Sequence, residues 1–426
     1  MGNKFKLILM NFLQFAVWGA YLTSQGKYLY DSGFADKIGW FYSVQGIVSI
    51  FMPAIIGIIA DKWIQAQKVL GISHAIAGIA MIAAGYYGVT SAGNTSLPVL
   101  FSLYTLSVMF YMPTIALSNS VAYNILEKWG LDPVEHFPPI RIWGTVGFIA
   151  SMWFVDLMDF EVSSVQYIVS GLLGLVLAIY SFFLPECPVI KTTEKKSLSE
   201  AMGLKAFALF KDKNMAIFFI FSMLLGIALQ ITNGFASPFL TDFGNLPEYA
   251  DSFWTKHSII LISLSQMSET LCILLIPFFM KRFGIKKVML LSMIAWVLRF
   301  GLFGIGDLGS GLVWIILSMI VYGVAFDFYN VSASLYVNKT TDKSIRSSAQ
   351  GLFMLMTNGL GASIGAMLAQ SVVNIFVNSR KAEGAQMVMD GWQTSWFIFA
   401  GYALVVAILF AILFRPGNSS EKQAKD

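Results

Sequence analysis

The sequence predicts an all-α protein that crosses a membrane many times. Of its 426 residues, 57% are hydrophobic and only 12% are charged, and the mean hydropathy is +0.69. Soluble domains carry roughly a quarter charged residues, which excludes a water-soluble globule of this size. The hydrophobic residues form runs of about 20, such as 215–235, 259–280 and 392–414. An α-helix needs that length to cross about 30 Å of hydrocarbon.

The runs predict twelve membrane-spanning helices, and no short alternating segments of the β-barrel type are present. The first run continues past Trp18 without a small-x-small cleavage site, so we expect a retained helix and not a signal peptide. In chain order the expected spans are 7–26, 38–60, 69–89, 97–124, 138–157, 163–185, 214–240, 257–280, 288–306, 311–336, 347–377 and 392–414.

The basic residues predict the orientation of these spans. Of the 28 Lys and Arg residues, 21 lie in the two tails and in the loops after even-numbered spans. Five lie in the loops after odd-numbered spans, and two lie within spans. Because positive residues favour the cytoplasmic side, both termini are expected in the cytoplasm. The net charge of +4 is therefore an orientation signal and not a nucleic-acid patch.

The chain divides near its midpoint. We expect a six-helix half at 1–185, a cytoplasmic linker at 186–213 with a short amphipathic helix near 198–210, a second six-helix half at 214–414, and a cytoplasmic tail at 415–426. The basic loop at 61–70 recurs as 281–290, an offset of about half the chain. Such an offset is typical of a duplicated six-helix unit.

Four ionisable residues fall inside the expected spans, namely Arg141, Glu269, Arg299 and Asp327. A charge in a membrane helix is costly, so each is a candidate functional residue. For Arg299, near the outer end of its span, we expect the side chain to snorkel outward. For His74 we expect a hydrogen-bonded packing role.

Polar and aromatic residues accompany the charges at helical spacing. Gln230 with Asn233, and Gln266 with Glu269, are each three positions apart and share a helix face. Asp327 follows Phe326, which lies one turn after Tyr322. The stripe Arg141, Thr145 and Phe148 follows i, i+4, i+7.

These residues indicate the kind of ligand. One arginine and two acids give a formal charge of −1, whereas a phosphorylated substrate requires surplus positive charge. Amides and rings instead suit a neutral, flat ligand with hydroxyl groups, and the two acids can carry protons. A sugar–proton symporter or an exporter remains an alternative. No nucleophile–base pair or metal spacing supports an enzyme, and we expect no cofactor or metal.

Several motifs resemble known transporters. Gly57-x-x-x-Asp61-Lys62 resembles the signature loop of the major facilitator superfamily, although Gln65 and Ala66 replace its usual Gly-Arg. In the second copy of the loop Lys281 replaces the acid, and Lys281 and Arg282 complete a candidate gating loop. The segments that match most specifically are 137–145, 215–233, 266–271, 322–330, 348–353 and 357–359. They resemble the bacterial nucleoside:proton symporters of that superfamily along nearly the whole chain.

The resemblance implies a twelve-helix, multi-pass importer of nucleosides driven by protons in a bacterial cytoplasmic membrane. It implies alternating access of two halves. We expect a monomer without nucleic-acid partners. Asp327 and Glu269 are the expected proton-coupling residues. The positions that match the family's substrate-binding and coupling residues are Arg141, Thr145, Phe148, Gln230, Asn233, Gln266, Glu269, Tyr322, Phe326 and Asp327.

Overall fold

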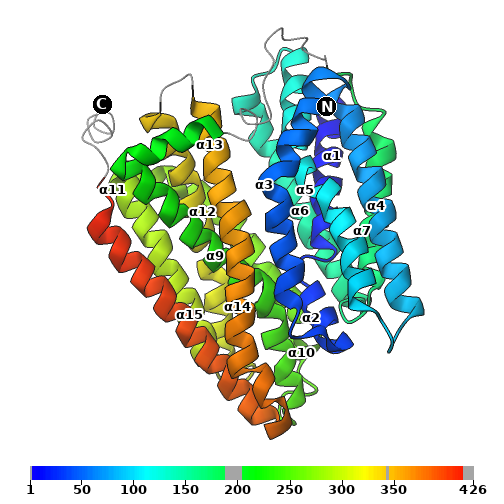
Figure 1. The fold of residues 1–426 in the computed structure, drawn as a ribbon, viewed down its shortest axis with the longest axis vertical. Coiled ribbons are helices and arrows are strands. Elements are labelled where there is room, and N and C mark those ends of the chain that lie inside the picture. Colours follow the sequence, from blue (N-terminus) through cyan, green and yellow to red (C-terminus); the bar gives the residue numbers. More distant parts are fainter. Residues whose placement is uncertain (1, 188–203, 342–344, 416–426) are drawn as a thin grey trace. The chain divides into compact units, whose positions relative to one another are not determined.

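The computed structural model describes residues 2–187, 204–341 and 345–415, and helices dominate every part of it. The chain separates into two compact units, Met1–Met202 and Gly203–Asp426 (Figure 1). Most of the predicted linker, at 188–203, lies outside the described residues, as does the tail after residue 415. At the end of the linker, a 3₁₀ helix at Leu204–Lys211 overlaps the amphipathic helix expected at 198–210.

The N-terminal unit is a bundle of long helices in which sequence neighbours are not always packing partners. In it α1 packs on α6 and α7, α4 packs on α5 and α7, and α3 packs on α5. Its helices are α1 (Gly2–Gly19), α2 (Gln25–Leu29), α3 (Ile38–Lys62), α4 (Ala66–Thr90), α5 (Leu97–Lys128), α6 (Pro133–Leu157) and α7 (Val165–Ser181).

The C-terminal unit repeats this packing scheme. Here α9 packs on α14 and the π-helical segment η4, and the long α11 packs on α12 and α15. Equivalent positions in the two bundles therefore use equivalent contacts, which fits the duplication that the basic loops indicate. The elements of this unit are α9 (Lys213–Asp242), α10 (Phe253–Lys256), α11 (Ser258–Ile305), α12 (Leu312–Thr340), α13 (Arg346–Met354), η4 (Leu355–Gly361), α14 (Ala362–Phe376) and α15 (Ala385–Leu413).

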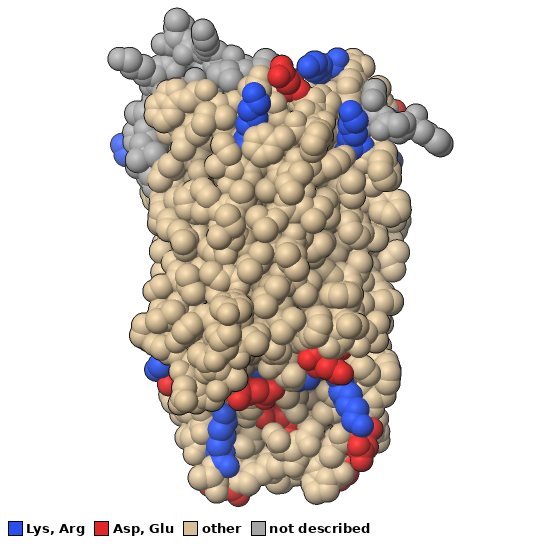
Figure 2. Space-filling model, turned by 90° about the vertical axis from the view of Figure 1, so that its right-hand side faces the viewer, with Lys and Arg blue, Asp and Glu red and all other residues tan. Residues whose placement is uncertain are grey.

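Nine helices among the described residues are long and apolar enough to cross a membrane. One of them, α11, covers two expected spans. Between these spans Gly284 breaks the regular helix geometry, with φ 78° and ψ 167°. Only glycine adopts such a conformation without strain. On the face drawn in Figure 2, the charged side chains of the described residues gather at the two ends, with a broad uncharged band between them. This is the surface expected of a protein immersed in hydrocarbon.

The first expected span is interrupted in the structure. The first was predicted as one helix over 7–26, but α1 ends at Gly19 and α2 begins only at Gln25. A side chain at Gly19 would collide with the backbone carbonyl of Phe148 in α6, so the two helices touch where α1 ends. Tyr42 then donates from its hydroxyl to the carbonyl oxygen of Leu22, over 2.6 Å, within the turn that follows. These tertiary contacts stabilise the break between α1 and α2, and a hydropathy profile contains no information about them.

Glycines bring helices of each bundle into backbone contact. A Cβ atom on Gly147 of α6 would overlap the carbonyl of Phe12 in α1. In the other unit, a Cβ atom on Gly226 of α9 would overlap the carbonyl of Thr357 in η4. Small residues allow such close approach, which helps membrane helices associate where the hydrophobic effect cannot drive them together. Both contacts lie beside candidate binding residues and fix the helices that carry them.

Candidate substrate site and buried charges

The candidate residues of the N-terminal unit lie on one face of α6. The guanidinium carbon of Arg141 lies 3.8 Å from the ring centroid of Phe15 in α1, a cation–π contact. Two turns further along, the buried Phe148 meets Trp18 of α1 edge-on at 6.2 Å. Thr145 lies between them and is half-buried. Arg141 is therefore held against α1 by aromatic contact at the same helix pair that the glycines bring together.

A polar network in α1, α4 and α5 includes His74, which is fully buried. The side-chain amide of Gln14 donates to Thr114 Oγ1 at 2.8 Å, and its oxygen lies 2.8 Å from His74 Nε2. Tyr111 donates to the carbonyl oxygen of Gln14 at 2.7 Å. His74 thus has the hydrogen-bonded packing role expected of it.

In the C-terminal unit, Tyr322 and Phe326 form an aromatic platform on α12. Their rings are nearly parallel, with an interplanar angle of 7° and a centroid distance of 5.8 Å. Trp296 of α11 meets Tyr322 edge-on at 6.0 Å and so fixes its ring. Phe326 borders a small hollow, which is also lined by Leu225, Gly226, Leu229, Trp296, Ala325, Tyr329, Asn330, Thr357 and Asn358.

The candidate amides and acids lie on three helices of the C-terminal unit, α9, α11 and α12. Gln230 and Asn233 on α9, and Gln266 and Glu269 on α11, are half-buried. Asp327 on α12 is only 5% exposed. Both Glu269 and Asp327 act electrostatically on Tyr322, so the acids and the platform belong to one neighbourhood. Seven of the ten candidate residues therefore lie in this bundle, and the structure assigns no ligand to them.

Sequence reasoning misjudged Arg299. The expected outward snorkelling is wrong, because the side chain is only 2% exposed. Its guanidinium donates to Thr232 of α9, Ser265 of α11 and the carbonyl of Ser318 in α12. The signal in the sequence was the presence of hydroxyl residues beside candidate site positions on three spans, but which of them meet the arginine depends on helix packing.

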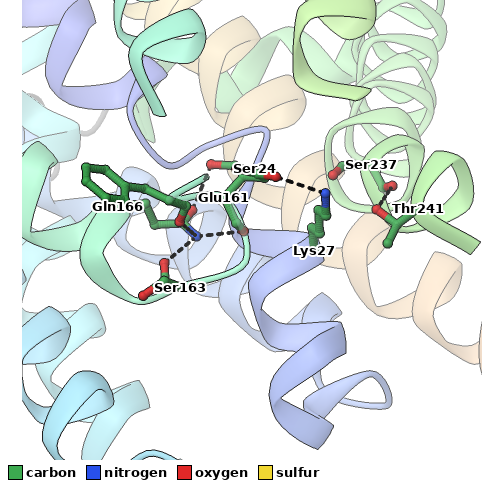
Figure 3. Close-up of polar contacts among 8 residues, drawn as sticks. Ser24, Lys27, Glu161, Ser163, Gln166, Ser237 and Thr241 are labelled. Carbon is green, nitrogen blue, oxygen red and sulfur yellow. Dashed lines mark hydrogen bonds and ion pairs between the residues drawn. The ribbon is translucent and has the colours of Figure 1, made fainter. Parts of the chain in front are cut away.

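A buried ion pair in the N-terminal unit also escaped the sequence analysis. Lys27 Nζ lies 3.0 Å from Glu161 Oε1, and the two side chains are 8% and 3% exposed (Figure 3). Gln166 donates to the backbone carbonyl of Glu161 at 3.1 Å and accepts from Ser24 at 2.7 Å. Asp156, at the end of α6, is fully buried and adds negative charge near Glu161. The sequence placed Lys27 in an outer loop and gave no sign of its partner.

The candidate gating loop is described only in part. Gly57 lies within α3, and the side chains of Asp61 and Lys62 fall outside the described ones. Lys281 and Arg282 are exposed where α11 breaks at Gly284. Their gating role remains a prediction.

The fold and the site define a class before any comparison is made. Two helical bundles with repeated packing, an uncharged surface band and polar groups buried within the helices are typical of a polytopic membrane transporter. A crystal structure of the D-xylose–proton symporter superposes over 98% of this chain and 98% of its own, with a TM-score of 0.69 at 12% identity. That similarity supports the major facilitator fold.

Comparison with known proteins then identifies the family. The family model described as nucleoside H+ symporter matches residues 1–419, and the chain belongs to that family. It is 48% identical to the xanthosine permease of Escherichia coli (strain K12), over 99% of this chain and 98% of the relative. A crystal structure of the nucleoside transporter NupG covers 97% of this chain and 100% of its own, with 45% identity and a TM-score of 0.87. These relatives are transporters and not enzymes, as the sequence predicted.

Proposed function

We propose that this protein imports nucleosides together with protons. The observation that carries the proposal is the C-terminal neighbourhood of a stacked ring pair, half-buried amides and two acids, in a chain of the nucleoside H+ symporter family. The relatives named above include a xanthosine permease and a nucleoside transporter, and the side chains here suit the same class of ligand.

Each part of a nucleoside has a matching group in this proposal. The Tyr322–Phe326 platform offers a flat face on which a base stacks. Gln230, Asn233 and Gln266 offer both donors and acceptors for the base edge and the ribose hydroxyls. Arg141, Thr145 and Phe148 supply the contribution of the N-terminal unit. We assign no metal or cofactor to the mechanism.

Proton coupling falls to the two acids. A neutral carboxyl group costs less to enclose in the membrane than a carboxylate, so protonation of Glu269 or Asp327 favours closure of the loaded carrier. The guanidinium of Arg141 stays charged at every relevant pH, so it does not carry the transported proton. Alternating access of the two bundles then moves nucleoside and proton together. Of the two acids, we favour Asp327, which follows the aromatic platform directly.

The proposal includes a topology. The nine apolar candidate spans become twelve membrane helices when α11 is divided at Gly284 and the shorter α1 and α7 are added. The Lys and Arg distribution supports a cytoplasmic location for both termini. The relatives from Escherichia coli support a bacterial inner membrane as the location of the protein. We propose that one chain suffices for transport.

Uptake into membrane vesicles tests the function. Labelled uridine, adenosine and xanthosine are offered under an inward proton gradient, with D-xylose as the control solute. We expect nucleoside accumulation that a protonophore abolishes, and no accumulation of xylose. Xylose uptake without nucleoside uptake would instead establish the sugar symporter. Labelling of single cysteines from outside intact cells tests the topology, because reaction at the linker would contradict it.

A further inference from the structure

Arg299 is a buried cation without a carboxylate partner in the part of the chain that the structure describes. Its side chain is 2% exposed, and no acid among the described residues lies within ion-pair distance of its guanidinium. An isolated buried charge is expensive, and evolution retains one only where hydrogen bonds compensate it and where it has a use. Its surroundings supply those hydrogen bonds from neutral groups.

The guanidinium connects three segments of the C-terminal bundle. It donates to Thr232 Oγ1 from Nη2 at 2.7 Å and from Nε at 3.2 Å. Nη1 donates to the carbonyl oxygen of Ser318 at 2.8 Å and to Ser265 Oγ at 3.3 Å. In return, Ser318 Oγ donates to the carbonyl oxygen of Arg299 at 2.8 Å. One side chain thereby fixes the second half of α11 to α9, to the first half of α11 and to α12.

Each of these anchors adjoins a residue of the proposed substrate site. Thr232 precedes Asn233, and Ser265 precedes Gln266. The third anchor, Ser318, lies one helical turn before Tyr322. A shift of any anchor therefore moves a binding side chain, and small displacements of such groups lower affinity strongly.

Arg299 also touches the aromatic platform directly. Its guanidinium carbon lies 4.5 Å from the ring centroid of Tyr322 and 5.1 Å from that of Phe303. With Trp296 against the edge of the Tyr322 ring and Phe326 stacked parallel to it, the ring is held from three sides. The guanidinium's planar fork can stack on a ring and donate in several directions at once, which an ammonium group cannot do.

We propose that Arg299 is the positioning residue of the substrate site: its guanidinium sets the register of three helix segments and orients Tyr322, without itself binding the nucleoside. This inference rests on the proposed function, because it specifies how the same site is built. The inference also predicts that the loss of Arg299 weakens ligand binding without an equal loss of stability. Removal of Arg299 leaves only neutral hydroxyl and carbonyl groups behind and no uncompensated charge, so its loss need not unfold the bundle.

The experiment compares four variants in detergent, with the Kd for uridine and the Tm measured on each. R299M removes the charge and keeps the length, R299K keeps the charge and loses the fork, and T232V removes one anchor. T394V is the matched control, because Thr394 donates to a backbone carbonyl in α15, away from the site residues. We expect the Kd to rise at least about tenfold in R299M and less in R299K and T232V. The Tm should change little in all four, and the Kd should stay unchanged in T394V.

A double-mutant cycle with Y322L completes the test. If Arg299 acts through Tyr322, the effects of R299M and Y322L on the Kd are less than additive. A wild-type Kd in R299M overturns the inference. If R299M does not fold, R299K and T232V decide, and a wild-type Kd in both also overturns it. Additive effects in the cycle would contradict the route through Tyr322. If the wild-type protein does not bind uridine, that result would instead contradict the proposed function.

Discussion

The N-terminal and C-terminal units share a packing scheme, but they bury charge in different ways. In the N-terminal unit, Lys27 and Glu161 form an ion pair in the connections outside the long helices. In the C-terminal unit, Arg299 lies inside the bundle and is held by hydroxyl and carbonyl groups. Two acids, Glu269 and Asp327, share its neighbourhood around Tyr322. Opposite charges are thus joined directly in one unit, whereas in the other the arginine is held by neutral groups and the acids lie near the same aromatic ring.

The corresponding connection in the C-terminal unit sharpens the contrast. There Trp392, at the start of α15, donates to Asp242 at the end of α9 over 2.6 Å. Asp242 also accepts from the side-chain amide of Asn245 at 3.1 Å. The ion pair joins α2, which follows α1, to the connection before α7, and the neutral donor joins the end of α9 to α15. Two duplicated units can thus keep a contact in a similar place and build it from different chemical groups.

The largest expected effect is on proton coupling, which the comparison assigns to the C-terminal unit. D327N and E269Q mimic the protonated acids. At the coupling acid, we expect proton-driven accumulation of nucleoside to be abolished while counterflow exchange persists, because the carrier can still close over its ligand. Uptake and exchange in vesicles at two pH values measure both. Normal accumulation with normal pH dependence in both variants would exclude these acids as proton carriers.

The next largest effect is on stability in the N-terminal unit. K27M leaves Glu161 buried without its partner, which should cost about 3–5 kcal/mol of unfolding free energy. The double variant K27M/E161Q removes both charges and should recover most of that loss. Thermal unfolding in detergent measures the three proteins. An unchanged Tm in K27M would show that the ion pair contributes nothing.

The same pair gives a pH dependence with a defined sign. Burial raises the pKa of the Glu161 carboxyl above its ordinary value, and Lys27 lowers it only in part. The folded protein therefore holds a proton on Glu161 more tightly than the unfolded chain does. That contribution to stability is complete below the ordinary pKa of Glu and is lost as the pH rises through the folded-state value. K27M should lose Tm more steeply than wild type as the pH rises above the ordinary pKa of Glu, whereas K27M/E161Q should not.

A smaller effect on binding is expected from the amides of α9. Q230A or N233A leaves polar groups of the ligand without partners, which should cost about 1–3 kcal/mol, or about 5- to 150-fold in Kd. Folding should survive, because each change removes a polar group from a membrane helix. Titration with uridine and adenosine checks both variants. Wild-type affinity in both would assign these amides to helix packing.

The smallest effect is expected at the neutral contact of the C-terminal unit. W392F removes one donor from Asp242, but the donor from Asn245 remains. We expect a loss of about 1.5 kcal/mol in unfolding free energy, clearly less than in K27M. Thermal unfolding of the two variants side by side makes the comparison. A larger loss in W392F than in K27M would reverse the contrast between the two connections.

The membrane class, the expected spans and the candidate binding residues follow from the sequence. Long apolar runs determine a class because the cost of placing charge in hydrocarbon acts on each residue separately. The repeat of the basic loop at half the chain length predicted the duplication. Helical spacing put Tyr322 and Phe326 one turn apart, and their rings are indeed stacked.

Other features depended on contacts between distant helices. The end of α1 at Gly19 follows from the backbone of α6, and the partner of Lys27 comes from a loop 134 positions away. The position of Arg299 near the outer end of its span predicted an outward side chain. Helix packing instead places the guanidinium against Thr232, Ser265 and Ser318. The sequence by itself determined which residues must leave water, because the free energy of transfer from water to hydrocarbon depends on each side chain separately. Only the tertiary structure decided what each buried charge meets there, because a hydrogen-bond partner is fixed by how neighbouring helices rotate and pack.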